Sequence, residues 1–223
     1  ITGALKDPNA NLKLDAQVGL KGEFPSVTGE TVIQELNLQK LKLYKDPLSL
    51  KGRIVMNMAS TNPDKPVGTI SAQDAVLDLN GKSYPVDSLY ARLDANGLNK
   101  SVIAQLPGAR LSLDGQFNYP QLYDIIAGEI SQYIALPALA YKRIPPPHAF
   151  TLSLKAYQNP LFQAFVPALT RMDTVRLDAY LDNNRDTTLS ATLRTGVIVY
   201  DTTTLQGSSF AIRGANNQLK VDG

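Results

Sequence analysis

Apolar and polar residues alternate with a period of two along most of this chain. Every second residue from Leu12 to Leu20 is apolar, and the residues between them are mostly polar. A similar alternation runs from Leu48 to Met58. Because successive side chains of a β-strand point to opposite faces, this period predicts strands with one apolar and one polar face.

A short strand motif recurs, consisting of Leu, a polar residue, Leu, a charged residue and then Gly or Ala. It reads LKLDA from Leu12, LSLKG from Leu48, LSLDG from Leu111 and LSLKA from Leu152. Repetition of such a strand predicts a mainly β fold built on a long sheet that is apolar on one side only. We expect a curved, open, antiparallel-type sheet, groove-like or solenoid-like, with two short helices.

Further alternating stretches add strands to this sheet. They are expected at Ser71–Leu79, Tyr84–Leu93, Phe150–Tyr157, Thr174–Leu181, Thr188–Leu193, Gly196–Tyr200 and Ser209–Arg213. Turn residues such as Asn80-Gly81 and Asn96-Gly97 separate several of them. Leu36 and Leu38 are out of phase with Leu41 and Leu43, which predicts a bulge or tight bend near Gln39 and Lys40.

Two stretches have helical spacing instead. From Tyr119 to Ile134 the apolar residues recur every three or four positions after a proline suited to a first turn. In Asn159–Leu169, Asn159 is a good N-cap, Pro160 suits the first helical position, and Pro167 should end or kink the helix.

These elements suggest a division of the chain. We expect N-terminal strand repeats at 1–118, a helix with a proline-rich connector at 119–147, and a second strand–helix–strand repeat at 148–223 that continues the first sheet. The run Pro145-Pro146-Pro147 favours an extended, stiff connector. Because the chain starts at Ile1 and stops in an alternating stretch, we interpret it as a fragment of a longer protein.

A sheet that is apolar on one side must cover that side with a second sheet, with helices or with a ligand. Two short helices are too few to cover so many strands. The pattern leaves open a β-sandwich or closed barrel, in which sheets cover one another, and an open sheet whose apolar face receives a ligand.

Composition narrows the classes of function. The 22 basic and 20 acidic residues are scattered singly and give a net charge of +2, so the sequence shows no basic patch for nucleic acid. The chain has no cysteine, which excludes disulfides and thiol catalysis. No apolar run approaches the roughly 20 residues that span a bilayer.

Candidate catalytic groups are few, and we expect no enzyme, cofactor or metal site. His148 is the single histidine and follows the three prolines, so we interpret it as a solvated or capping residue. Asp178, Asp182 and Asp186 lack the spacing of a calcium loop, and Asn183-Asn184-Arg185-Asp186 is typical of a hairpin turn.

The order of motifs from Leu111 to Gly223 resembles the TamB and AsmA-like family of Gram-negative envelope proteins. The strand LSLKAYQ is followed by NPLFQAFVPAL, RLDAYLDN, LSATLRTGVIVY and a strand pair that ends in NQLKVDG. LYKDPLSLKGRI, from Leu43 to Ile54, is similar to another strand of that family.

The resemblance implies a periplasmic bridge, anchored in the inner membrane, whose apolar groove carries phospholipid toward the outer membrane. It also implies a part in outer-membrane biogenesis, in a translocation and assembly module beside an outer-membrane barrel partner. The family region that meets this partner has no match here. A non-enzymatic β-sandwich interaction module of a large secreted or surface protein remains the alternative.

If the resemblance holds, aliphatic residues of the alternating strands should form the lipid-contacting floor of the groove, although each of them also suits an ordinary core. The candidates are Leu12, Leu14, Val18, Leu36, Leu38, Leu50, Ile54, Met56, Leu77, Leu79, Leu111, Leu113, Phe117, Leu152, Leu154, Leu177, Leu189 and Leu193.

Overall fold

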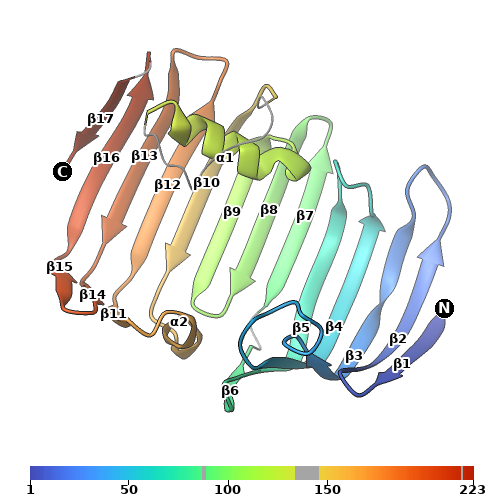
Figure 1. Cartoon of the computed structure of the whole chain (residues 1–223). Coiled ribbons are helices and arrows are strands. Elements are labelled where there is room, and N and C mark those ends of the chain that lie inside the picture. Colours follow the sequence, from blue (N-terminus) through green and yellow to red (C-terminus); the bar gives the residue numbers. More distant parts are fainter. Residues whose placement is uncertain (87–88, 134–145, 217) are drawn as a thin grey trace.

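A computed structural model describes residues 1–86, 89–133, 146–216 and 218–223. The fold is mainly β, as the alternation predicts, and most of the strands join one large antiparallel sheet (Figure 1). Part of the expected proline-rich connector, including Pro145, lies outside the described residues.

The first half of the chain forms nine strands of this sheet. They are β1 (Thr2–Asp7), β2 (Ala10–Gly19), β3 (Ser26–Asn37), β4 (Leu48–Ser60), β5 (Val67–Leu79), β6 (Lys82–Pro85), β7 (Tyr90–Asn96), β8 (Asn99–Leu106) and β9 (Ala109–Gln116). Two helical segments follow, the 3₁₀ turn η1 (Tyr119–Gln121) and helix α1 (Leu122–Ser131).

The second half adds the remaining strands and one short helix. They are β10 (Ala149–Ala156), α2 (Pro160–Phe165), β11 (Leu169–Met172), β12 (Val175–Asp182), β13 (Thr187–Thr195), β14 (Ile198–Tyr200), β15 (Thr203–Leu205), β16 (Ser208–Ala215) and β17 (Gln218–Asp222).

The large sheet has 14 strands in the order β1-β2-β3-β4-β5-β7-β8-β9-β10-β12-β13-β16-β17, and β6 pairs with β5 at the side. Strands β11, β14 and β15 form a separate sheet of three strands. Strand β9 pairs with β10 along its whole length. The strands that precede and follow the connector are therefore neighbours, and the large sheet is continuous. The sheet is not closed into a barrel, and the described residues do not form a sandwich.

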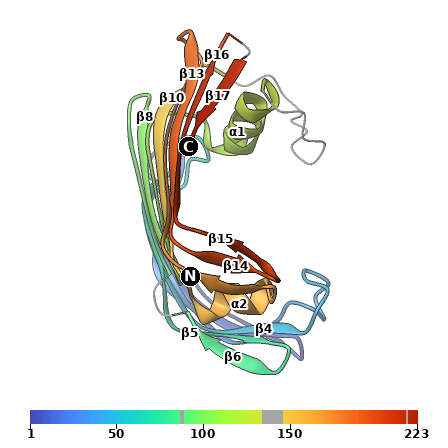
Figure 2. The same ribbon diagram turned by 90° about the vertical axis from the view of Figure 1, so that its left-hand side faces the viewer.

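The sheet is strongly curved, as seen edge-on in Figure 2. Helix α1 lies against one end of its concave face, and α2 with the three-stranded sheet lies on the same side at the other end. Gly52 and Gly115, which close two copies of the repeated motif, have φ angles of 144° and 133°. Residues that carry a side chain rarely adopt such φ angles, so glycine allows each of these strands to bend at this position.

The helix starts follow from local sequence. Asn159 caps α2, since its Oδ1 accepts a hydrogen bond of 2.8 Å from the backbone N–H of Leu161, and Pro160 occupies the first turn. The helix ends at Phe165, ahead of Pro167. Gln39 and Lys40 lie in a turn, as predicted, but Leu41 and Leu43 are exposed and belong to no strand.

The strand expected at Tyr84–Leu93 is wrong as a single element. Strand β5 is 13 residues long and has two partners on one side: β6 pairs with its last residues and β7 with its first. Val86 and Leu89, between these two strands, also form backbone hydrogen bonds with Ala75 and Ala72 of β5, of 2.8 and 2.9 Å.

Candidate functional site

Strand pairing aligns apolar residues in an unbroken row across the large sheet, which we call the central row. In the strand order of the large sheet, every strand from β2 to β16 contributes one residue, and each of these residues lies directly opposite the next. The row consists of Ala16, Gly29, Met56, Ile70, Ala91, Ala104, Leu111, Leu154, Leu177, Leu193 and Phe210.

A second apolar row runs beside the central row on the same face, and we call it the helix-side row. It extends from β2 to β17 in continuous register. Its members are Val18, Val27, Met58, Gly68, Leu93, Val102, Leu113, Leu152, Ala179, Ala191, Ile212 and Val221. Neither row contains a polar or charged residue.

The face that carries these rows is the concave one. Ile125 of α1 packs in one cluster with Leu113, Phe150 and Leu181 of the sheet, and Figure 2 places α1 inside the curve. The opposite, convex face carries the intervening residues, such as Arg110, which are mostly polar.

Burial differs sharply along this concave face. Beneath α1, Leu113 is 3% exposed, Phe150 1% and Leu181 4%. In the central row, by contrast, Leu111, Leu154, Leu177, Leu193 and Phe210 are all only half-buried. The covering elements therefore close the helix end of the face but leave the middle of its aliphatic surface in contact with solvent.

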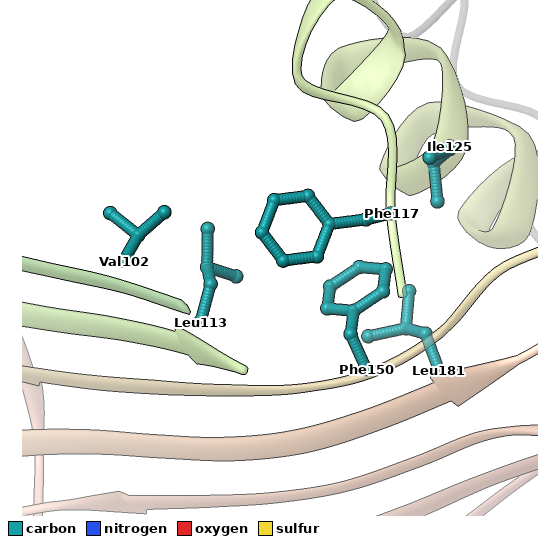
Figure 3. Packing of buried hydrophobic residues seen from close by; sticks show 6 residues of the cluster. All are labelled: Val102, Leu113, Phe117, Ile125, Phe150 and Leu181. Atoms are coloured by element: carbon teal, nitrogen blue, oxygen red, sulfur yellow. The ribbon is translucent and has the colours of Figure 1, made fainter. Parts of the chain in front are cut away.

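The closed end is an ordinary packed core (Figure 3). The rings of Phe117 and Phe150 pack edge-on at 5.5 Å between centroids, and Ile125 is fully buried. Lys100 lies over the rings of Phe117 and Tyr119 and donates a hydrogen bond to the backbone oxygen of Phe117. Burial lowers the pKa of Lys100.

An ion pair fastens α1 to the sheet. Nε2 of His148, just before β10, lies 3.3 Å from Oε1 of Glu129 in α1, and both side chains are almost completely buried. The expectation that His148 is solvated is therefore wrong. The helix that covers it lies earlier in the chain, and the neighbouring prolines give no indication of it.

The electrostatics of this pair favour the charged imidazole. Burial by itself would lower the pKa of His148. The contact with Glu129, the hydrogen-bonding contact of 2.9 Å between Nδ1 and the Pro146 oxygen, and the negative charges of Glu129 and Asp182 outweigh it, so the net pKa is raised.

At the other end of the concave face, α2 helps to cover a second cluster. Leu161 and Ala164 of α2 pack against the group of Leu48, Leu79 and Tyr84. The ring of Tyr44 meets Phe165 at right angles, with 6.3 Å between centroids. The middle of the concave face thus lies between two covered margins.

The structure distributes the predicted groove residues over these regions. Met56, Leu111, Leu154, Leu177 and Leu193 lie in the central row, and Val18, Leu113 and Leu152 in the helix-side row. Leu12, Leu14 and Ile54 lie on β2 and β4, and Leu189 lies opposite Leu181. Leu36, Leu50 and Leu77 pair across β3, β4 and β5, while Leu38 follows β3 in a turn.

Three of the predicted groove residues are core residues in the structure. Leu79, Leu113 and Phe117 are 5%, 3% and 4% exposed beneath the two covered margins. Sequence reasoning also missed the residues that complete the central row, which are Ala16, Gly29, Ile70, Ala91, Ala104 and Phe210. Their signal is the alternation itself, because each occupies the apolar phase of its strand once the register is known.

The described chain also has local hollows. An apolar cavity of about 60 Å³ on the concave side is lined by residues that include Leu50, Ile54 and Ala72. Two open hollows of about 510 and 480 Å³ share Asp15 and Glu30, which belong to the polar face. The hollow of about 480 Å³ is also lined by Ala16, Gly29 and Met56, the first three residues of the central row, whereas no residue of that row lines the other.

The Asp178–Asp186 stretch forms the predicted hairpin between β12 and β13. Asp182 is buried, and burial would raise its pKa, but the hydrogen bonds from Tyr180 and Asn184 and the charge of Arg185 outweigh burial and lower it. Within the described ranges, no three His, Cys, Asp or Glu side chains gather as metal ligands would. No helix of the described residues is long and apolar enough to cross a membrane.

Comparisons with known proteins found no match. No protein-family model fits the chain, and neither a curated protein nor a solved structure is significantly similar to it.

Proposed function

We propose that the concave face of this sheet binds the acyl chains of phospholipids and conducts them along the central row. One observation carries the proposal: a continuous aliphatic row crosses the sheet in register, and its middle stays half-buried while both margins are covered.

The free energy of hydrating an acyl chain makes such a surface useful. Each methylene group exposed to water costs about 0.8 kcal/mol, so a chain of about 16 carbons costs on the order of 13 kcal/mol. A bare aliphatic row removes much of this surface from water, while the charged headgroup remains outside. The same contact covers apolar protein surface that otherwise faces solvent.

The chemistry of the row favours movement of a lipid over tight capture. Leu154, Leu177 and Leu193 offer similar dispersive contacts on successive strands, and no charged residue of the row selects a headgroup. A chain that slides from one strand to the next exchanges one set of aliphatic contacts for an equivalent set. No position should therefore hold the lipid strongly.

The cellular setting comes from the resemblance alone. We propose that the chain works in the periplasm as part of a bridge that is anchored in the inner membrane and supplies phospholipid to the outer membrane. An outer-membrane barrel assembly protein would be its partner in the full-length context. These proposals rest on the motifs between Leu43 and Gly223.

Lipid binding can be tested with one pair of variants in the same strand. In β13, Leu193 lies in the central row opposite Leu177 and Phe210, whereas Ser190 lies on the convex face and is exposed. Leu193→Asp places a carboxylate on the proposed path, and Ser190→Asp adds the same charge outside it. Binding is measured with a phospholipid that carries a fluorophore at the end of one acyl chain.

We expect Leu193→Asp to weaken lipid binding at least tenfold, since a charge on the path loses its hydration when a chain covers it. Ser190→Asp should bind as the unmodified chain does, and circular dichroism should show both variants folded. Equal binding by a folded Leu193→Asp variant would remove the central row from the lipid path. Absence of any lipid binding by the unmodified chain would favour an interaction module.

A further inference from the structure

The convex face carries a row of four basic residues that the linear sequence does not reveal, and we call it the basic ladder. Arg110, Lys155, Arg176 and Arg194 lie directly opposite one another on the adjacent strands β9, β10, β12 and β13. Adjacent strands are about 4.8 Å apart, so the four side chains leave the sheet within about 14 Å.

The cations of the ladder have no acidic partners within the described residues. All four are exposed, and the one hydrogen bond that their described side chains make is a long contact of 3.5 Å from Nη2 of Arg110 to Oε1 of Gln105. Some other cations of the sheet are paired: Arg53 lies 3.7 Å from Glu30, and Arg92 lies 2.7 Å from Asp94.

Like charges directly opposite each other destabilise a sheet. The ladder contains three such pairs in succession, whereas the same row continues with Gln105 and Tyr90 on one side and Ser209 on the other. The acidic residues nearest to the ladder on this face, Asp178 and Asp114, form no ion pair with it, and Asp178 accepts a hydrogen bond of 2.6 Å from Ser153. An anionic partner would relieve the repulsion.

We propose that the basic ladder docks the convex face on a membrane surface that contains anionic phospholipid headgroups. Two observations favour a lipid surface over an acidic polypeptide. The ladder crosses four adjacent strands on the convex side of the sheet, and the helices and the three-stranded sheet all lie on the opposite side, so a flat surface can approach the ladder (Figure 2). The next row consists of Ser112, Ser153, Asp178 and Thr192, whose side chains are all small.

Small neighbouring side chains argue against a protein partner, because protein interfaces usually depend on a large side chain anchored in a pocket. None of the hollows described above is lined by a ladder residue. A charged surface without anchors suits a partner that presents many mobile negative charges. Each cation near an anionic membrane surface raises the partitioning of the protein onto that membrane by roughly fivefold at low ionic strength. The contact should therefore be reversible and sensitive to salt.

The inference is independent of lipid conduction by the concave face, and the experiment separates the two. The chain is sedimented with vesicles of phosphatidylcholine alone and with vesicles that also contain phosphatidylglycerol, at low and at high salt. Binding through the apolar face would occur on both kinds of vesicle and resist salt. Binding through the ladder needs the anionic lipid and is lost at high salt.

The variant that tests the ladder changes all four residues to Gln. A matched control changes Lys6, Lys13, Lys21 and Lys45 to Gln, which removes the same charge from exposed positions outside the ladder. We expect the ladder variant to lose binding to anionic vesicles by roughly a hundredfold or more, and the control to lose much less. Loss of opposed like charges should leave the ladder variant folded.

Three results would overturn the proposal. Equal binding to neutral and anionic vesicles would exclude the ladder as the contact, as would equal losses in the two variants. Binding of polyglutamate to the ladder, without binding to anionic vesicles, would assign the surface to an acidic protein instead.

Discussion

At the scale of single residues, the pair of His148 and Glu129 stands apart in the described part of the chain, because both partners of this ion pair are buried. The second carboxylate oxygen of Glu129 has no hydrogen-bond partner. A buried charge that loses its counter-ion is strongly unfavourable, so the protonation of His148 bears directly on how firmly α1 is held.

The pH dependence follows from the direction of the pKa shift. Folding raises the pKa of His148, so its contribution to stability is fully present below the ordinary value of about 6.5. It is lost as the pH rises through the raised value. We expect the free energy of unfolding, measured with urea, to be higher at pH 6 than at pH 9, and this difference to shrink in Glu129→Gln.

Removal of the acidic partner provides a second readout. Glu129→Ala should lower the free energy of unfolding at pH 6 by about 3 kcal/mol or more, since it leaves a buried cation unpaired. Lys220→Met is the control, because it breaks an ion pair of 3.2 Å with Asp222 in which both side chains are exposed. It should change the free energy of unfolding by about 0–1 kcal/mol. Similar losses of unfolding free energy in the two variants would show that the buried ion pair stabilises the fold no more than the exposed one.

At the scale of elements, α1 acts as a cover. Ile125 is 0% exposed and contacts the sheet cluster of Phe150 and Leu181. Tyr133, just beyond the helix, lies over Gly214, and its hydroxyl is 2.6 Å from Oγ1 of Thr188. Helix α1 therefore spans several strands and limits the open part of the concave face on that side.

Ile125→Ala tests this role. The substitution should lower the free energy of unfolding by about 2–5 kcal/mol, because the cavity that it leaves is fully enclosed. Leu98→Ala, at the 69% exposed tip of the hairpin between β7 and β8, should change it by about 0.5 kcal/mol or less. Chemical denaturation of both variants gives the comparison, and equal effects would mean that α1 is not packed as described.

Sequence reasoning predicted the elements well where one rule dominated. The alternation around Leu111 and Leu152 predicted their strands and the shared apolar face, and Asn159-Pro160 predicted the start of α2. It missed β8, because Ile103 on the convex side interrupts the alternation of Val102 and Ala104. No local rule could reveal His148 against Glu129 or the basic ladder, since strand order and helix docking bring those residues together.

At the scale of the whole molecule, the two faces of one curved sheet have opposite character. The concave face presents aliphatic rows that run across the strands, and the convex face presents hydroxyl and charged side chains. In the middle of the sheet the two characters alternate residue by residue: Leu154 belongs to the central row and Lys155 to the basic ladder. This alternation supplies an internal control for any experiment that maps lipid contact.

The most direct test is photo-crosslinking of the unmodified chain to a phospholipid that carries a diazirine in its acyl chain, with the attachment sites located by mass spectrometry. We predict crosslinks at Leu111, Leu154, Leu177, Leu193 and Phe210. Their sequence neighbours Arg110, Lys155, Arg176, Arg194 and Ser209, which face the other way, should remain unlabelled. Labelling of both sets alike, or no specific labelling at all, would contradict a lipid path along the concave face.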